Sequence, residues 1–131
     1  MAAADPQSAI LVVDDYHAMV LTIHHMLRQL GFHNLFEAND GNQAWQTLCA
    51  RPFHLVISDL RMRDVNGLEL LRRVRAHETM RALPFIMVTA AGERDHVLEA
   101  KEAGVTDYIV KPFTIATLKA KLATALGDPA G

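Results

Sequence analysis

The sequence predicts an α/β fold in which one doubly wound, five-stranded parallel sheet lies between two layers of helices. Three observations lead to this prediction. Short, unbroken apolar runs rich in β-branched residues recur along the chain, segments of helical period separate them, and the two kinds of segment alternate five times. Such alternation favours a parallel sheet with right-handed crossovers. Ligands of these folds bind at the carboxyl ends of the strands.

Five strands are expected, and each is short. Four are continuous apolar runs that suit strands buried on both faces, whereas the run at 34–38 is more polar. The expected strands comprise residues 10–13, 34–38, 55–57, 85–88 and 108–110.

Five helices follow these strands, and end signals place several of their boundaries. Gly31 stops the first helix and Gly104 the fourth, because glycine readily adopts the conformation that ends a helix. Asp40 caps the second helix and Thr114 the fifth. The apolar stripe on the fourth helix is thin, so we expect this helix to be held loosely.

Length and composition indicate one globular domain. The chain has 131 residues, half of them apolar, and we expect a flexible N-terminal tail at 1–7, a domain at 8–127 and a C-terminal tail at 128–131. The single cysteine, Cys49, excludes an internal disulfide and favours a reducing compartment. The beginning of the chain has neither the basic region nor the apolar stretch of a signal peptide, and no membrane span is expected. We therefore expect a cytoplasmic protein.

The charge distribution disfavours a nucleic-acid partner. The net charge is −2 and the basic residues are scattered over helical segments. We expect the seven histidines, including the adjacent His24 and His25, to be solvated surface side chains, because neighbours on a helix point apart and are poor co-ligands. His17 follows Asp15 by two residues and could border a pocket there, but we interpret it as a surface residue too.

Polar side chains lie where four of the predicted strands end. They are Asp14 and Asp15 after the first strand, Asp59 after the third, Thr89 after the fourth and Lys111 after the fifth. Because these ends meet at one edge of a parallel sheet, we expect the five side chains to converge. Neighbouring carboxylates repel one another, so a cation should bind among them. Mg²⁺ fits best, because it prefers a few carboxylates with water and phosphate oxygens.

A metal, a carboxylate, a hydroxyl and a lysine together form a site for phosphoryl transfer. Asp59 can attack phosphorus to give an aspartyl phosphate, while the metal and Lys111 offset the phosphoryl charge and Thr89 donates a hydrogen bond. Each residue taken alone has a simpler structural explanation. An acidic pair after a strand, for example, is often a helix cap. Only the joint pattern is specific.

The chain resembles the receiver domains of response regulators over nearly its whole length. The segments that carry the resemblance are LVVDD at 11–15, SD at 58–59, NG at 66–67, MVTA at 87–90 and YIVKPF at 108–113. Within the family it is most similar to chemotaxis response regulators, notably in VISD at 56–59, GLELL at 67–71 and ALP at 82–84. The resemblance, and not the strand pattern, implies the strand order 2-1-3-4-5 of flavodoxin-like folds.

The resemblance implies a role for each acidic residue. A histidine kinase would phosphorylate Asp59. Asp14 and Asp15 would hold Mg²⁺ directly or through water, together with Asp59 and the backbone carbonyl of Arg61, and Mn²⁺ is an expected substitute.

The resemblance also implies a switch. In the family the residue matching Thr89 moves toward the phosphoryl group and the aromatic matching Tyr108 turns inward, which reshapes the face of the fourth helix, fifth strand and fifth helix. Lys111 should precede a cis peptide bond to Pro112. The implied protein is a signalling switch and not an enzyme, except that it catalyses its own phosphorylation and dephosphorylation. The implied partners are a histidine kinase, an output protein such as the flagellar motor switch, and a phosphatase, and we expect a monomer.

Several residues depart from the family pattern. Arg63 stands where receivers usually carry a proline, so the loop after Asp59 loses a fixed φ. Arg61 and Ala91 occupy positions that influence phosphoryl lifetime in the family, and we expect an altered lifetime without a stated direction. The only tryptophan, Trp45, lies on the second helix, so its fluorescence should report phosphorylation poorly.

Other functions stay open on the sequence alone. A receiver of this size can serve as a phosphorelay intermediate or phosphate sink outside chemotaxis. A different class is a receiver-like interaction module that is never phosphorylated, although the complete set of site residues argues against it. A flavodoxin-like cofactor binder is disfavoured, because Asp14 and Asp15 would repel the phosphate of the ligand.

Overall fold

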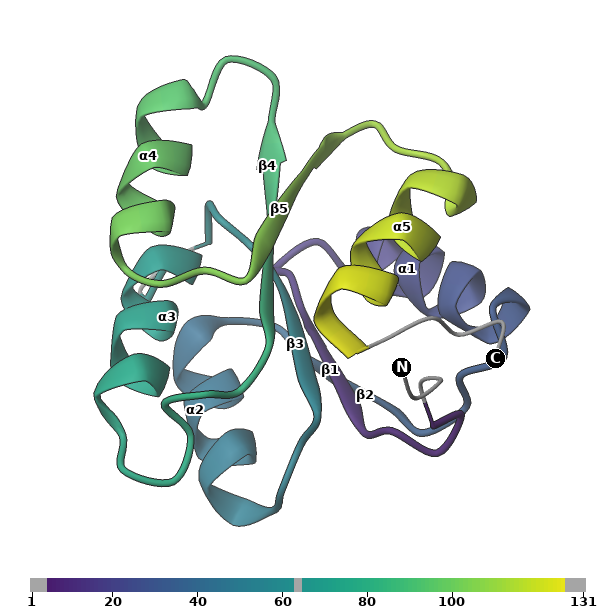
Figure 1. Ribbon diagram of the computed structural model, residues 1–131, viewed down its shortest axis with the longest axis horizontal. Coiled ribbons are helices and arrows are strands. Elements are labelled where there is room, and N and C mark those ends of the chain that lie inside the picture. Colours follow the sequence, from purple (N-terminus) through teal and green to yellow (C-terminus); the bar gives the residue numbers. More distant parts are fainter. Residues whose placement is uncertain (1–4, 63–64, 127–131) are drawn as a thin grey trace.

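The computed structural model describes residues 5–62 and 65–126, with Arg94 described by its backbone alone. Strands and helices alternate strictly along the chain (Figure 1). The elements are β1 (Ile10–Val13), α1 (His17–Gln29), β2 (Leu35–Ala38), α2 (Gly41–Ala50), β3 (Leu55–Asp59), α3 (Gly67–Ala76), β4 (Phe85–Ala90), α4 (Arg94–Glu102), β5 (Asp107–Lys111) and α5 (Ile115–Leu126).

The strands form one parallel sheet in the order β2-β1-β3-β4-β5. Helices α1 and α5 cover one face, and α2, α3 and α4 cover the other (Figure 1). The predicted fold class and strand order are therefore confirmed.

Alternation along β1 divides the interior into two cores. Ile10 and Val12 pack with apolar residues of α1 and α5, whereas Leu11 and Val13 pack with those of α2 and α3. Successive side chains of a strand point to opposite faces, so a strand covered on both sides must be apolar throughout. Each such buried side chain contributes about 1.5–3 kcal/mol to folding, which explains why the central strands read as unbroken apolar runs.

Helix α4 packs through a narrow apolar stripe, as the sequence predicts. Among its described side chains Ala100 is buried and Val97 half-buried, Ala103 just after the helix is half-buried, and Leu98 is 54% exposed. A small residue buries little apolar surface. This helix is consequently the one with the weakest apolar attachment to the sheet.

The predicted capping residues act at the helix ends. The Asp40 carboxylate accepts a hydrogen bond from the Gln43 backbone N–H at 2.7 Å, and the Thr114 hydroxyl accepts one from the Thr117 backbone N–H at 3.2 Å. Gly31 has φ +99°, in the left-handed region where a side chain would be strained. The boundaries of α1, α2 and α5 thus follow from local chemistry.

Two local predictions are wrong. Asp59, Thr89 and Lys111 do not follow their strands but lie within them, because the parallel pairing of β3, β4 and β5 continues past the apolar runs. His24 is not a solvated residue: it is 7% exposed on the inner face of α1, with a ring nitrogen 3.1 Å from the Phe36 carbonyl oxygen. Burial lowers the pKa of His24, since it disfavours the imidazolium.

The ends of the chain are described only in part. Residues 5–7 are exposed and precede the first strand. The remainder of the expected tails, residues 1–4 and 128–131, and the unusual Arg63 lie outside the described residues. Within the described ranges, no helix has the length and apolarity needed to cross a membrane.

Candidate functional site

Three carboxylates meet at the carboxyl edge of the sheet. Asp14 and Asp15 follow β1, Asp59 ends the neighbouring β3, and one carboxylate oxygen of each lies within 4.8 Å of the others. Asp14 is 2% exposed and Asp59 8% exposed, so water screens their charges poorly. The predicted convergence of these residues is present in the structure.

Lys111 places a positive charge beside two of these carboxylates. Its ammonium lies 2.9 Å from Asp59 Oδ1 and 4.0 Å from Asp14 Oδ2. The peptide bond from Lys111 to Pro112 is cis, as the family resemblance implies. The single Lys111 ammonium is thus shared between the Asp14 and Asp59 carboxylates.

Burial changes the proton affinity of Asp14 and Asp59. It raises the pKa of Asp14 from 3.8 to about 6, and the charge of Asp59 adds to this effect, while a hydrogen bond from the Tyr16 backbone N–H opposes it. Burial also raises the pKa of Asp59, and its hydrogen bond with Lys111 opposes that shift. A cation bound among the carboxylates would favour their ionised forms.

The donor set fits Mg²⁺. It consists of hard carboxylate oxygens from two segments of the chain, Asp14 and Asp15 after β1 and Asp59 in β3. The Arg61 carbonyl belongs to the loop that leaves β3 next to Asp59, which is compatible with its implied role as a further ligand.

The hydroxyl of Thr89 is buried without a partner. Thr89 lies in β4 and is 2% exposed, and within the described part of the chain its Oγ1 has no hydrogen-bond partner. An unsatisfied buried hydroxyl costs about 1–3 kcal/mol. Such groups call for an explanation, and a hydroxyl that binds a ligand oxygen would provide one.

Gly67 permits the backbone to close behind the acceptor. A Cβ at this position would lie 2.3 Å from the Asp59 carbonyl oxygen and 2.8 Å from the Met87 sulfur. The Gly67 N–H donates to the Leu60 carbonyl at 2.9 Å. The sequence indicated only that the Asn66-Gly67 pair opens a helix, and the steric requirement becomes visible only in three dimensions.

Tyr108 lies half-buried on β5, on the same strand as Lys111. Its ring is 5.4 Å from both the Lys101 and the Lys121 ammonium groups. A hollow of about 230 Å³ has Thr89, Val97 and Tyr108 in its lining. The two residues predicted to move in the switch therefore border one space, which leads toward α4.

Arg61 forms an ion pair that the sequence did not reveal. Its guanidinium donates two hydrogen bonds to the Glu93 carboxylate, and His96 Nδ1 lies 2.6 Å from Glu93 Oε2. Arg61 and Glu93 are far apart in the chain, so no local spacing predicts their contact. Ala91, the other residue linked to phosphoryl lifetime, is exposed in the loop after β4.

Two peripheral residues behave as expected. The His17 side chain is 60% exposed and pairs with Glu37 at 3.0 Å, on the rim of a hollow that also includes Asp15. The Trp45 ring packs edge-on against His77 with centroids 5.7 Å apart, on the α2–α3 side of the sheet.

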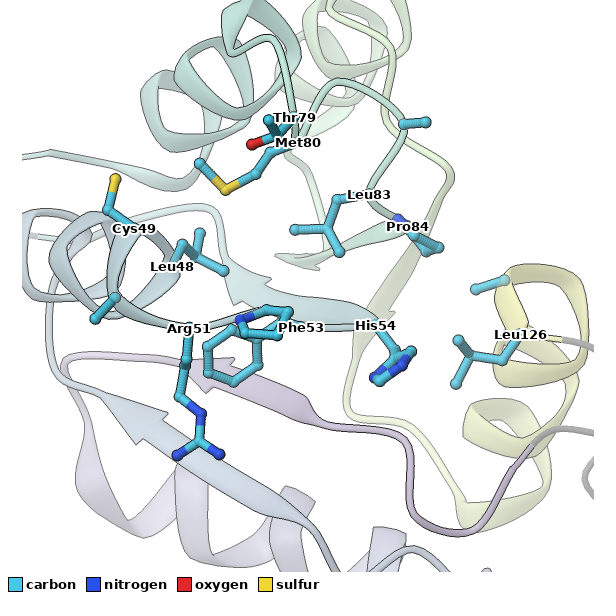
Figure 2. A pocket seen from close by; sticks show the side chains of 14 residues that line it. Leu48, Cys49, Arg51, Phe53, His54, Thr79, Met80, Leu83, Pro84 and Leu126 are labelled. Atoms are coloured by element: carbon cyan, nitrogen blue, oxygen red, sulfur yellow. The ribbon is translucent and has the colours of Figure 1, made fainter.

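A larger hollow lies away from the candidate site. It has a volume of about 820 Å³ and lies beside the segments that enter β3 and β4, at the edge of the sheet opposite the carboxylates (Figure 2). Its labelled lining is largely apolar, with Leu48, Phe53, Leu83 and Leu126. The free Cys49 also borders it and is exposed. The titratable side chains in this lining are Cys49, Arg51 and His54, and the lining contains no carboxylate, so it does not resemble the acidic cluster.

The fold and the acidic site define a class of protein. Residues 10–123 match the response regulator receiver domain, and the chain belongs to this family. It is 46% identical over 113 residues to chemotaxis protein CheY-3 of Vibrio cholerae, covering 86% of this chain and 87% of that protein. It is also 46% identical over 113 residues to chemotaxis protein CheY of Pseudomonas aeruginosa, covering 86% and 91% of the two chains.

A solved structure supports the comparison at the level of the fold. The receiver domain of a sensor histidine kinase from Pseudomonas aeruginosa superposes with a TM-score of 0.82 at 31% identity, over 92% of this chain and 98% of that one. That structure contains a magnesium ion coordinated in its active site cleft.

Proposed function

We propose that this protein is a response regulator that a histidine kinase phosphorylates on Asp59 in the presence of Mg²⁺. The observation that carries the proposal is the contact between Asp59 Oδ1 and the Lys111 ammonium at 2.9 Å, within a cluster of three carboxylates at the carboxyl edge of the sheet. We expect the protein to act as a cytoplasmic monomer and as a switch, with no reaction on a separate substrate.

Asp14, Asp15, Asp59 and the Arg61 carbonyl would hold the metal. When bound, Mg²⁺ would offset the negative charge of the phosphoryl oxygens, and Mn²⁺ would substitute for it. The magnesium ion in the related receiver domain supports this assignment. The raised pKa of Asp14 supports it further, since burial and the charge of Asp59 disfavour the ionised form and a bound cation would offset both effects.

The residues of this chain would perform the transfer directly. A carboxylate oxygen of Asp59 forms a bond to phosphorus as the bond from phosphorus to the donor nitrogen of the kinase histidine breaks, and that electron pair stays on the nitrogen, which takes up a proton. Lys111 lies within hydrogen-bond distance of the acceptor and would stabilise the phosphoryl charge. The unpartnered Thr89 hydroxyl would then donate to a phosphoryl oxygen.

The proposed output is a change of surface on the α4-β5-α5 side. Movement of Thr89 toward the phosphoryl group would enlarge the hollow that it shares with Tyr108, and the Tyr108 ring would turn inward. Helix α4 can follow because few apolar contacts hold it. Partners would read this surface.

The proposed pathway is chemotaxis, with the flagellar motor switch as output and a phosphatase to end the signal. Its support is the identity of 46% to two chemotaxis proteins over most of the chain. The test is expression in a bacterium that lacks its own chemotaxis regulator. Restored reversal of swimming direction by the wild type, and none by Asp59→Asn, is expected. A phosphorelay intermediate or phosphate sink would accept phosphate but leave swimming unchanged.

The chemical proposal has its own test. Beryllofluoride is a phosphoryl analogue, and we expect its binding to shift the amide resonances of Thr89, Tyr108 and Lys111 only when Mg²⁺ is present. Asp59→Asn should abolish these shifts. A protein that never responds to beryllofluoride with Mg²⁺ would instead be a receiver-like interaction module.

A further inference from the structure

An ion-pair network borders the pocket of the phosphoryl acceptor. The Glu93 carboxylate lies just before α4 and receives two hydrogen bonds from the Arg61 guanidinium, at the start of the loop after β3. His96, in the first turn of α4, contacts the same carboxylate at 2.6 Å. Glu93 therefore ties the acceptor loop to the beginning of α4.

The pair forms part of the wall around Asp59. A small pocket of about 70 Å³ is lined by Asp59, Leu60, Arg61, Ala90, Glu93 and Lys111. The space around the Asp59 carboxylate in this pocket is thus small. Arg61 and Glu93, two of the six lining residues, are joined by the ion pair. A group that reaches Asp59 through this pocket therefore passes the Arg61–Glu93 ion pair.

The Arg61–Glu93 ion pair is more restrained than an ordinary ion pair on the protein surface. The Arg61 side chain is 69% exposed, and exposed pairs are usually weak. Here, however, the contact is bidentate, the Glu93 side chain is only 11% exposed, and His96 fixes the same carboxylate. Arg61 and His96 lower the pKa of Glu93, so this group stays ionised at neutral pH.

We propose that Glu93 is a positioning residue that holds Arg61 in the wall of the Asp59 pocket and thereby slows hydrolysis of the aspartyl phosphate. This inference rests on the proposed phosphorylation of Asp59. In hydrolysis, a water oxygen bonds to phosphorus and the bond between phosphorus and the Asp59 oxygen breaks. The electron pair returns to the carboxylate, while one water proton stays on the phosphate and the other passes to solvent. A guanidinium fixed in the wall restricts the path of that water.

Single and double variants test the proposal. Wild type, Glu93→Gln, Arg61→Ala and the double variant are phosphorylated with phosphoramidate and Mg²⁺, the donor is removed, and loss of the phosphoryl group is followed by intact mass. We expect each single variant to hydrolyse about three- to tenfold faster than wild type, which corresponds to a modest change in barrier. The double variant should hydrolyse no faster than the faster single variant, because both changes break one interaction.

The chain offers a matched control. Arg72 and Glu99 also form an ion pair between the α3 and α4 segments, at 3.8 Å, and neither lines the Asp59 pocket. Glu99→Gln should keep the wild-type rate of hydrolysis. Equal acceleration in this control would overturn the proposal in favour of general loosening of α4.

A second readout does not depend on phosphorylation. Nitrogen-15 NMR of the Arg61 Nε–H should show a resonance protected from exchange in wild type and lost in Glu93→Gln. If wild type accepts phosphate but Glu93→Gln hydrolyses at the wild-type rate or more slowly, the proposed role of Glu93 fails while the proposed function stands. If wild type accepts no phosphate, both fail, even where the NMR signal shows that the ion pair exists.

Discussion

The Lys111 ammonium lies 2.9 Å from Asp59 Oδ1 and 4.0 Å from Asp14 Oδ2, so one cation at the end of β5 contacts carboxylates from two other strands. The three residues lie far apart in the sequence, and the strand order brings β1, β3 and β5 to the same edge of the sheet. Lys111 can therefore stabilise the acceptor carboxylate before transfer and the phosphoryl group after it.

Lys111→Met should impair both stability and phosphorylation. Loss of the ammonium leaves buried carboxylates without their cation, which we expect to reduce the free energy of unfolding at pH 8 by about 1–3 kcal/mol. The rate of phosphorylation by a small donor should fall roughly ten- to a hundredfold. Chemical denaturation and single-turnover labelling measure the two effects. Lys119→Met, at an exposed position on α5, should change neither quantity.

Thr89→Val should stabilise the protein and disable the switch. It replaces an unsatisfied buried hydroxyl by a methyl group of similar size. In buffer without metal or phosphate, the free energy of unfolding should therefore rise by about 1 kcal/mol. The response of Tyr108 to beryllofluoride should disappear. Thr89→Ser retains the hydroxyl and should keep the response. A full response in Thr89→Val would contradict the assigned role of this hydroxyl.

Asp14 should make the metal-free protein less stable as the pH rises. Its pKa is about 6 in the folded state and 3.8 when exposed, so its stabilising contribution is complete below about pH 4 and is lost as the pH passes 6. The loss is on the order of 3 kcal/mol by the usual conversion of a pKa difference. Thermal unfolding at several pH values, with a metal chelator present, measures it.

The Asp14→Asn variant isolates the contribution of Asp14 to the pH dependence of stability, since all other groups titrate in both wild type and variant. Relative to wild type, the variant should gain stability between pH 4 and pH 8 without metal. Mg²⁺ should stabilise wild type at pH 8 and have little effect on the variant. A difference between the two proteins that does not vary with pH would show that Asp14 is ionised throughout this range.

Gly67→Ala should disturb the acceptor more than the fold. The added methyl group meets the Asp59 carbonyl at 2.3 Å, and the resulting shift should cost about 1–3 kcal/mol and reduce phosphorylation. Gly31→Ala introduces strain at φ +99° with no atom within 4 Å of the new methyl group. It should lower stability and leave phosphorylation at the wild-type level. Equal phosphorylation of Gly67→Ala and wild type would contradict the expected steric effect of the added methyl group on Asp59.

The strands of the sheet could be predicted from the sequence because an unbroken apolar run is a local signal. The unbroken apolar runs of β1, β3 and β4 predict strands buried on both faces, and each run is confirmed. The strand order came from resemblance instead, since apolarity alone does not state which strands are neighbours. Strand ends were placed too early at Asp59, Thr89 and Lys111, because backbone pairing continues through polar residues when the adjacent strand is present.

The site could be predicted as a set of residues but not as an electrostatic arrangement. That Asp14, Asp15 and Asp59 converge follows from strands that end at one edge. The Arg61–Glu93–His96 network and the burial of His24 depend on contacts between loops and on the orientation of a helix. No periodicity in the sequence encodes those contacts, so only the folded chain reveals them.

The identity of the acceptor is tested most directly by intact mass spectrometry. After incubation with phosphoramidate and Mg²⁺, wild type should carry one added phosphoryl group, and Asp59→Asn should carry none. Wild type treated with a chelator of divalent metals should also stay unmodified. No adduct on wild type with Mg²⁺, or an adduct of the same mass on Asp59→Asn, would contradict the assignment of Asp59 as the phosphoryl acceptor.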